Sequence, residues 1–160
     1  MSGMTFAEMI LKAAIEGMAR DLMTEHGLPV TGPGAWVFRW DRSKTREGAC
    51  IYGRRVISLS WPVAQIREIA ESRDTVLHEI AHAIAGYRAA HGPAWKAVCR
   101  KIGARPKACS DGERAAMRYT GACPAGHTVQ RDRVTDKARA SWCGKCYRAG
   151  VRVHFTWTEN

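Results

Sequence analysis

The pentad His78-Glu79-Ile80-Ala81-His82 is the feature that most restricts the fold and the chemistry of this 160-residue chain. It lies inside a stretch, from Val76 to Ile84, whose apolar residues recur at helical spacing. Residues four positions apart share one face of a helix, so both imidazoles can bind one ion. Glu79 then projects beside that ion, where a carboxylate can take a proton from water. The pattern predicts a Zn²⁺ site for hydrolysis in which Glu79 is the catalytic residue.

A third ligand is expected, because catalytic zinc sites have three protein ligands and one open position. His91 follows His82 by nine residues and precedes Gly92-Pro93, where the chain is expected to leave the helix and turn back. Glu113 is the only glutamate between residues 80 and 158 and is the alternative. We predict His78, His82 and His91 as the ligands of a catalytic zinc and keep Glu113 as the alternative to His91.

A second group of metal ligands is predicted near the C-terminus. The chain holds six cysteines and no visible export signal, so metal or redox chemistry is expected rather than disulfides. A C-x₃-H knuckle and a C-x₂-C knuckle together offer a closed Cys₃His set, which is typical of structural zinc. The alternatives are a redox C-x-x-C pair, free structural thiols, and Cys109 in place of the histidine. The predicted structural ligands are Cys123, His127, Cys143 and Cys146.

The charge of the chain is uneven along its length. Of 25 Lys and Arg and 15 Asp and Glu, residues 96–160 hold 14 basic and 5 acidic side chains, whereas residues 1–95 hold 11 and 10. An anionic partner such as nucleic acid is therefore expected for the C-terminal part, and a merely solvated basic face is the alternative. Of the aromatic residues Trp142, Tyr147 and Trp157, at least two are expected in a small core. The cations predicted to contact DNA, single-stranded or distorted, are Arg131, Arg133, Lys137, Arg139, Lys145 and Arg148.

The pattern of helices and strands predicts an α+β fold. Thr5 and Glu8 form a capping-box pattern, and Gly103 ends the last predicted helix. We expect a helical HExxH metalloprotease core with a small β-sheet at residues 1–104, a linker at 105–118, and a basic zinc-ribbon-like β module at 119–160. The predicted elements are helices at 5–27, 60–70, 74 to about 90 and 93–103, and strands at 36–40, 49–52, 56–59 and 151–157.

These motifs together resemble the SprT-like family, which includes the Spartan proteases of DNA–protein crosslinks. The specific likeness is the HExxH pentad followed by His91-Gly92-Pro93-x-Trp95; Phe38-Arg39-Trp40-Asp41, Arg46-x-Gly48-x-Cys50 and Ile57-Ser58-Leu59-Ser60 add to it. The resemblance covers roughly residues 5–103 and extends to the C-terminal zinc ribbon, where His127 is a departure. It implies that His78, His82 and His91 bind zinc and that Glu79 is the general base. Tyr52 and Tyr87 are candidate transition-state stabilisers by residue type alone.

The expected function is therefore a zinc-dependent endopeptidase that acts on DNA-associated proteins, including DNA–protein crosslinks, and is recruited by a basic zinc ribbon. The alternative is a non-proteolytic DNA-binding zinc protein, which would not need Glu79 beside its metal. Two Zn²⁺ ions are expected, one catalytic and one structural. The expected partners are DNA and DNA-bound proteins. We expect a monomer without membrane association, in the cytoplasm at the nucleoid, or in the host cytoplasm if the chain is viral.

Overall fold

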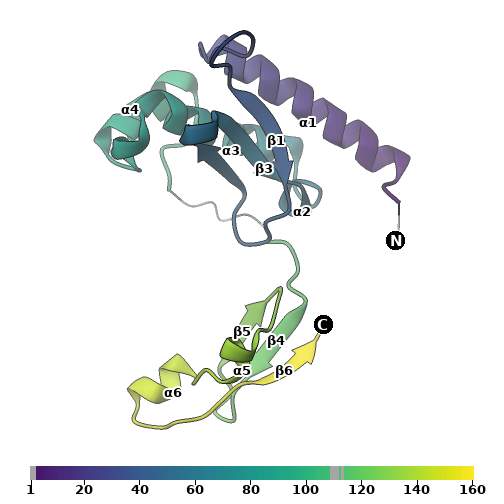
Figure 1. Cartoon of the computed structure of the whole chain (residues 1–160), viewed down its shortest axis with the longest axis vertical. Helices are drawn as coiled ribbons and strands as arrows, with labels where there is room; N and C mark the ends of the chain where they lie inside the picture. Colours follow the sequence, from purple (N-terminus) through teal and green to yellow (C-terminus); the bar gives the residue numbers. More distant parts are fainter. Residues whose placement is uncertain (1–2, 109–111, 113) are drawn as a thin grey trace. The chain divides into compact units, whose positions relative to one another are not determined.

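The computed structural model describes residues 3–108, 112 and 114–160, which form two compact units, Met1–Ala115 (unit 1) and Ala116–Asn160 (unit 2). Both units contain helices and a three-stranded sheet, so the fold is α+β (Figure 1). Within these described ranges, no helix combines the length and the apolar character that crossing a bilayer requires. The cysteines that the structure describes are all free thiols.

The first helix of unit 1, α1 (Phe6–Glu25), begins at the predicted capping box. The Thr5 hydroxyl accepts the Glu8 N–H at 3.2 Å, and the Glu8 carboxylate accepts the Thr5 N–H at 2.6 Å, which satisfies two of the free donors of the first turn. Gly27 follows the helix with a φ of 77°, a conformation that glycine adopts without strain. The buried face of α1 consists of Ile15, Ala19, Leu22 and Met23.

The sheet of unit 1 has the order β1-β3-β2, with β1 (Val37–Asp41) parallel and β2 (Gly48–Ile51) antiparallel to the central β3 (Val56–Ser60). The 3₁₀ helix η1 (Tyr52–Arg54) joins β2 to β3. Phe38 and Cys50 both pair with Ile57, so these three side chains share one face of the sheet. That face packs against α1 and the site-bearing helix α3 (Ile69–Ala85).

The helix predicted at residues 60–70 is wrong beyond its first turn. Ser60 caps the short α2 (Trp61–Ala64) by accepting the Val63 N–H, and α3 then begins at Ile69. Asp74, predicted to open the next helix, lies inside α3. Its carboxylate accepts hydrogen bonds from the backbone and the guanidinium of Arg105, at 3.1 and 2.6 Å, instead of capping α3. A partner 31 residues away thus explains why the polar side chain of Asp74 is placed within a helix.

The end of α3 also differs from the prediction of about residue 90. Gly86, with a φ of 84°, follows α3, and a 3₁₀ turn, η2 (Tyr87–Ala89), continues the chain. The last helix of unit 1, α4 (Pro93–Ile102), has the predicted bounds and buries Trp95 and Cys99 against α3. Unit 1 therefore presents the pentad on a helix between a sheet and a second helix.

Unit 2 is built from short elements around cysteines. Its sheet has the order β5-β4-β6, all antiparallel, from β4 (Tyr119–Ala122), β5 (Thr128–Arg131) and β6 (Thr156–Glu159). The strand predicted at 151–157 is wrong except for its end, since His154 forms only an isolated bridge with Trp142. Two helical turns were not predicted, α5 (Asp136–Arg139) and α6 (Gly144–Arg148).

Candidate metal centres and active site

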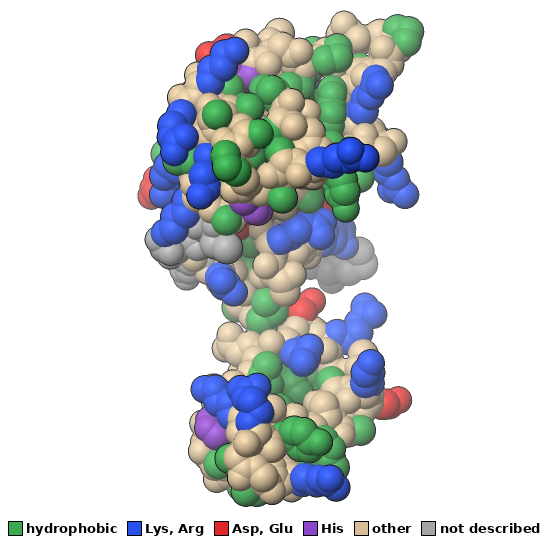
Figure 2. Space-filling model, turned by 90° about the vertical axis from the view of Figure 1, so that its left-hand side faces the viewer, with side chains coloured by type: hydrophobic (Ala, Val, Ile, Leu, Met, Phe, Trp, Pro, Cys, Tyr) green, Lys and Arg blue, Asp and Glu red, His purple; other side chains and the backbone are tan. Residues whose placement is uncertain are grey.

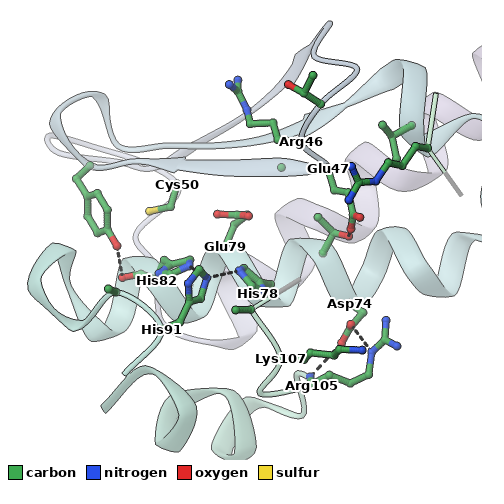
Figure 3. A pocket seen from close by; sticks show the side chains of 18 of the residues that line it. Arg46, Glu47, Cys50, Asp74, His78, Glu79, His82, His91, Arg105 and Lys107 are labelled. Atoms are coloured by element: carbon green, nitrogen blue, oxygen red, sulfur yellow. Dashed lines mark hydrogen bonds and ion pairs between the residues drawn. The ribbon is translucent and has the colours of Figure 1, made fainter. Parts of the chain in front are cut away.

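Three histidines converge at the floor of a cavity in unit 1 (Figure 3). His78 and His82 come from α3, and His91 comes from the turn before α4. The Nε2 atom of His91 lies 3.2 Å from that of His78 and 3.1 Å from that of His82. A tetrahedral zinc with Zn–N bonds near 2.05 Å spaces two ligand nitrogens by about 3.3 Å. The three imidazoles therefore fit a single zinc ion as they stand.

Two features hold the three histidine rings in place. One is the turn that brings His91 back to α3, and the other is the side chain of Trp95, which packs against the rings. Ala90 adopts φ 41° and ψ −126°, a region that costs an L residue roughly 1–3 kcal/mol and that clusters at functional sites. Trp95 is completely buried, with its ring centroid 4.7 Å from those of His78 and His91 and 5.3 Å from that of His82. One rigid indole thus contacts all three rings.

The rings of His78 and His82 are uncharged at neutral pH, as metal ligands must be. Burial, followed by the charge of the neighbouring His91, lowers the pKa of His78 to about 4. Burial and the charge of His78 lower the pKa of His82 to about 4 in the same way. Their nitrogens are therefore free to bind an ion at pH 7.

Glu79 lies on the side of α3 that faces β2, and only 7% of its surface is exposed. Burial raises the pKa of its carboxyl to about 8 in the absence of an ion, although a hydrogen bond from the Cys50 backbone acts in the opposite direction. A Cβ added at Gly48 would lie 3.1 Å from the Glu79 Cγ. A glycine in β2 therefore allows the carboxylate to lie close under the edge strand, beside the three histidines (Figure 3).

Two further side chains of this region line the same cavity. The Tyr52 hydroxyl donates to the His82 carbonyl at 3.1 Å, and its ring packs edge-on against that of Tyr87. Burial, then Cys50, raises the pKa of Tyr52 to about 12, so its hydroxyl remains a donor. Cys50 is half-buried and borders both the core and the cavity. Burial and then Glu79 raise the pKa of its thiol to about 12.

A model of the SprT-like family matches residues 20–114, more than half of the chain. The chain belongs to the SprT-like family. The match covers the sheet, α3, the turn with His91 and α4 of unit 1, and the family suggests a metalloprotease-like domain. No curated protein and no solved structure gives a significant match to the chain.

The second predicted ligand group also comes together, in unit 2 of this SprT-like protein and beyond the matched residues. The Sγ atoms of Cys123 and Cys146 lie 3.8 Å apart, and His127 Nδ1 lies 3.5, 3.6 and 3.4 Å from Cys123, Cys143 and Cys146 Sγ. A tetrahedral zinc with Zn–S bonds near 2.3 Å spaces two sulfurs by about 3.8 Å, and a sulfur and a nitrogen by about 3.55 Å. The four donors fit a closed site. Cys109 and Glu113, the alternative ligands, lie outside the described residues.

Local structure explains how the second group forms. The turn between β4 and β5 closes through Gly126, whose φ is 77°, so that Cys123 and His127 face each other. Cys143 and Cys146 come from the start of α6, where the backbone N–H groups of Lys145 and Cys146 donate to the Cys143 sulfur. The backbone N–H of Cys146 is the main cause that lowers the pKa of Cys143 to about 6, which favours the thiolate that a metal requires.

All six cations predicted to contact DNA are exposed on unit 2, in or next to β5, α5 and α6. The expectation that at least two of three aromatic residues form the core is wrong. Only Trp157 is packed, over Gly121, where an added Cβ would meet its ring at 3.0 Å. Trp142 and Tyr147 are 43% and 54% exposed. The small core is filled by cysteine sulfur, Val153 and Phe155, which leaves Trp142 outside it. The Trp142 ring stacks instead on His154, with centroids 4.1 Å apart.

The unit boundary changes where the positive charge belongs. Unit 1 contains 17 Lys and Arg against 12 Asp and Glu, and unit 2 contains 8 against 3. Each unit therefore carries a formal surplus of five positive charges, so half of the net charge of the chain lies outside unit 2. Figure 2 shows Lys and Arg side chains outnumbering Asp and Glu over both units on the face it presents.

Proposed function

We propose that this SprT-like protein is a zinc-dependent endopeptidase that acts on DNA-associated proteins, including DNA–protein crosslinks. The observation that carries the proposal is the convergence of three histidine nitrogens beside a buried glutamate in one open cavity. A purely structural zinc site is closed by four protein ligands, as in unit 2, whereas this site offers three and a carboxylate. The cavity, of about 770 Å³, gives a polypeptide access to both.

The residues of the cavity suit peptide hydrolysis. Zinc bound by the three histidines would polarise the scissile carbonyl and lower the pKa of water. Glu79 takes a proton from the attacking water, whose oxygen bonds to the carbonyl carbon, and passes it to the amine nitrogen as the C–N bond breaks. The Tyr52 hydroxyl, which lines the cavity and donates to the His82 carbonyl, would exchange that partner for the substrate's carbonyl oxygen. Trp95 keeps the rings in place during these steps.

We propose that unit 2 is the module that recruits the protease to DNA. The Cys₃His group holds a structural zinc, and the same unit carries exposed cations and two exposed aromatic rings on which bases can stack. Trp142 and Tyr147 are exposed, and the guanidinium of Arg152 lies 6.0 Å from the Trp142 ring centroid. Cations and open rings together favour single-stranded or distorted DNA, whose bases are accessible.

The test is a cleavage assay on a protein bound or crosslinked to single-stranded DNA, with wild type and Glu79→Gln compared. We expect the wild type to cleave the DNA-bound protein faster than the free protein. Glu79→Gln should keep DNA binding and zinc but lose cleavage by at least about 100-fold, because the proton carrier is removed. Trp142→Ala is the matched variant for unit 2 and should lower only the stimulation by DNA.

Two outcomes would contradict the proposal. If wild type and Glu79→Gln are equally inert on DNA-bound proteins while both bind DNA, the protein is the non-proteolytic DNA-binding alternative. If cleavage is intact but independent of DNA and of Trp142, unit 2 does not recruit the protease.

A further inference from the structure

The walls of the cavity that holds Glu79 are rich in positive charge. Its lining includes three acidic side chains, Glu47, Asp74 and Glu79. Apart from Arg67, which is nearly buried, six basic side chains line it: Lys44, Arg46, Arg88, Arg105, Lys107 and Arg114. The lining of the cavity therefore has a more positive charge than residues 1–95, the almost neutral stretch from which most of the lining comes.

Ion pairs neutralise part of this charge, including that of Arg46, which pairs with Asp41 at 3.0 Å, but they leave a positive surplus. Glu47 pairs with Arg67 at 3.1 Å, and the side chain of Arg67 is only 4% exposed. Asp74 pairs with Arg105 at 2.6 Å. Glu79 is buried at the floor, next to the metal donors. A bound Zn²⁺ would add two further positive charges at the floor.

The cations lie along the cavity rather than at one point. In Figure 3, Arg46 approaches from the β2 side, whereas Arg105 and Lys107 lie on the other side, near Asp74. Arg88 belongs to η2, three residues before His91. Arg88 and Arg114 are exposed, and no ion pair joins either of them to another described residue. These two guanidinium groups are open to a bound ligand.

We propose that the cavity selects polypeptide segments with acidic side chains flanking the scissile bond. This inference rests on the proposed proteolytic function and adds the substrate class. A scissile bond can reach Glu79 only if the flanking polypeptide lies along the cavity, so its side chains meet Arg88 on one part and Lys107 or Arg114 on another. Guanidinium groups bind carboxylates with two parallel hydrogen bonds, which favours Asp and Glu. A few separated cations match the spaced carboxylates of an acidic peptide better than they match the continuous row of phosphates in a nucleic acid.

The test uses peptides that share one scissile sequence and differ only in flanking residues, either Asp and Glu, Asn and Gln, or Lys. We expect kcat/KM with wild type to fall in that order, by about tenfold from the acidic to the amide peptide when two exposed charge pairs are lost. The preference should shrink between low and physiological salt, because exposed charges are screened.

Paired variants test whether the arginines of the cavity cause the preference for acidic peptides. Arg88→Gln and Arg114→Gln should each lower kcat/KM on the acidic peptide by about threefold, through KM, and lower it less on the amide peptide. Arg73→Gln and Arg100→Gln remove the same charge from exposed positions of unit 1 outside the cavity and should change neither. Binding of single-stranded DNA to the same variants is measured alongside.

The failures are separable. Equal or reversed preference among the peptides, or equal effects of cavity and control variants, would contradict the substrate class while leaving proteolysis intact. Loss of DNA binding in the two cavity variants, without a change in peptide preference, would assign the cavity walls to nucleic acid instead. If wild type cleaves none of the peptides and no DNA-bound protein, the proposed function itself is wrong.

Discussion

At the scale of single residues, the geometry of the site depends on Gly48, because a residue with a side chain would not fit there. A Cβ at Gly48 would lie 2.8 Å from the Ser58 carbonyl oxygen and 3.1 Å from atoms of Thr75 and Glu79. The first distance is shorter than side-chain carbons tolerate against a backbone atom. Gly48 therefore allows α3 to approach β2 closely enough for the Cys50 backbone to reach the Glu79 carboxylate.

Gly48→Ala is expected to lower the free energy of unfolding by about 1–3 kcal/mol, because α3 and β2 must move apart. It should also lower kcat, because Glu79 moves with α3. Chemical denaturation and peptide cleavage measure the two effects. Gly17→Ala is the control: Gly17 lies in α1 with nothing within 4 Å of an added Cβ, so this change should stabilise by about 0.5–1 kcal/mol. Unchanged stability and kcat in Gly48→Ala would contradict the account.

The sequence predicts the members of each metal group because their spacing is local. His78, Glu79 and His82 lie within one pentad, and each knuckle of unit 2 lies within five residues. Gly48, Cys50 and Tyr52 reach the site from a strand and a turn about 30 residues earlier, and only tertiary pairing places them there. In the sequence, the family-like Arg46-x-Gly48-x-Cys50 pattern pointed to Gly48 and Cys50, and residue type alone pointed to Tyr52.

At the scale of elements, boundaries were predictable where the end signals are local. Thr5 with Glu8, and Pro93 with Gly103, mark α1 and α4 by their own backbone chemistry. The start of α3 was missed because Asp74, which resembles a cap, binds Arg105 instead. In unit 2 the alternation of apolar residues at 151–157 is not a strand signal, because sulfur atoms, rather than a sheet face, form the core there.

The elements of unit 2 are too short to be stable alone. Its strands have four residues each, its helices four and five, and its buried core consists of Cys123, Cys143 and Cys146. Chelation should therefore unfold unit 2 and leave unit 1 folded, since seventeen buried apolar residues hold unit 1. Limited proteolysis with mass spectrometry should then show new cleavage sites only at residues 116–160.

The matched variant is Cys143→Ser, which should expose the same sites without a chelator. New sites in both units at once, or in neither, would show that metal does not hold unit 2 together.

At the scale of the whole molecule, the two units divide the proposed work, and each has five surplus positive charges. Unit 2 combines exposed cations with two partly exposed aromatic rings, a combination that suits nucleic acid. In unit 1 they line the cavity that holds Glu79 and the three histidines. The same net charge thus has two predicted partners, DNA for one unit and an acidic polypeptide for the other.

The zinc content of the purified chain tests the central claim most directly, with wild type measured against His91→Ala. Two metal centres predict about two zinc ions per wild-type chain and about one in His91→Ala, whereas Glu79→Gln should keep both. One zinc per wild-type chain, with the same value in His91→Ala, would contradict the proposal that α3 and the following turn build a catalytic metal site.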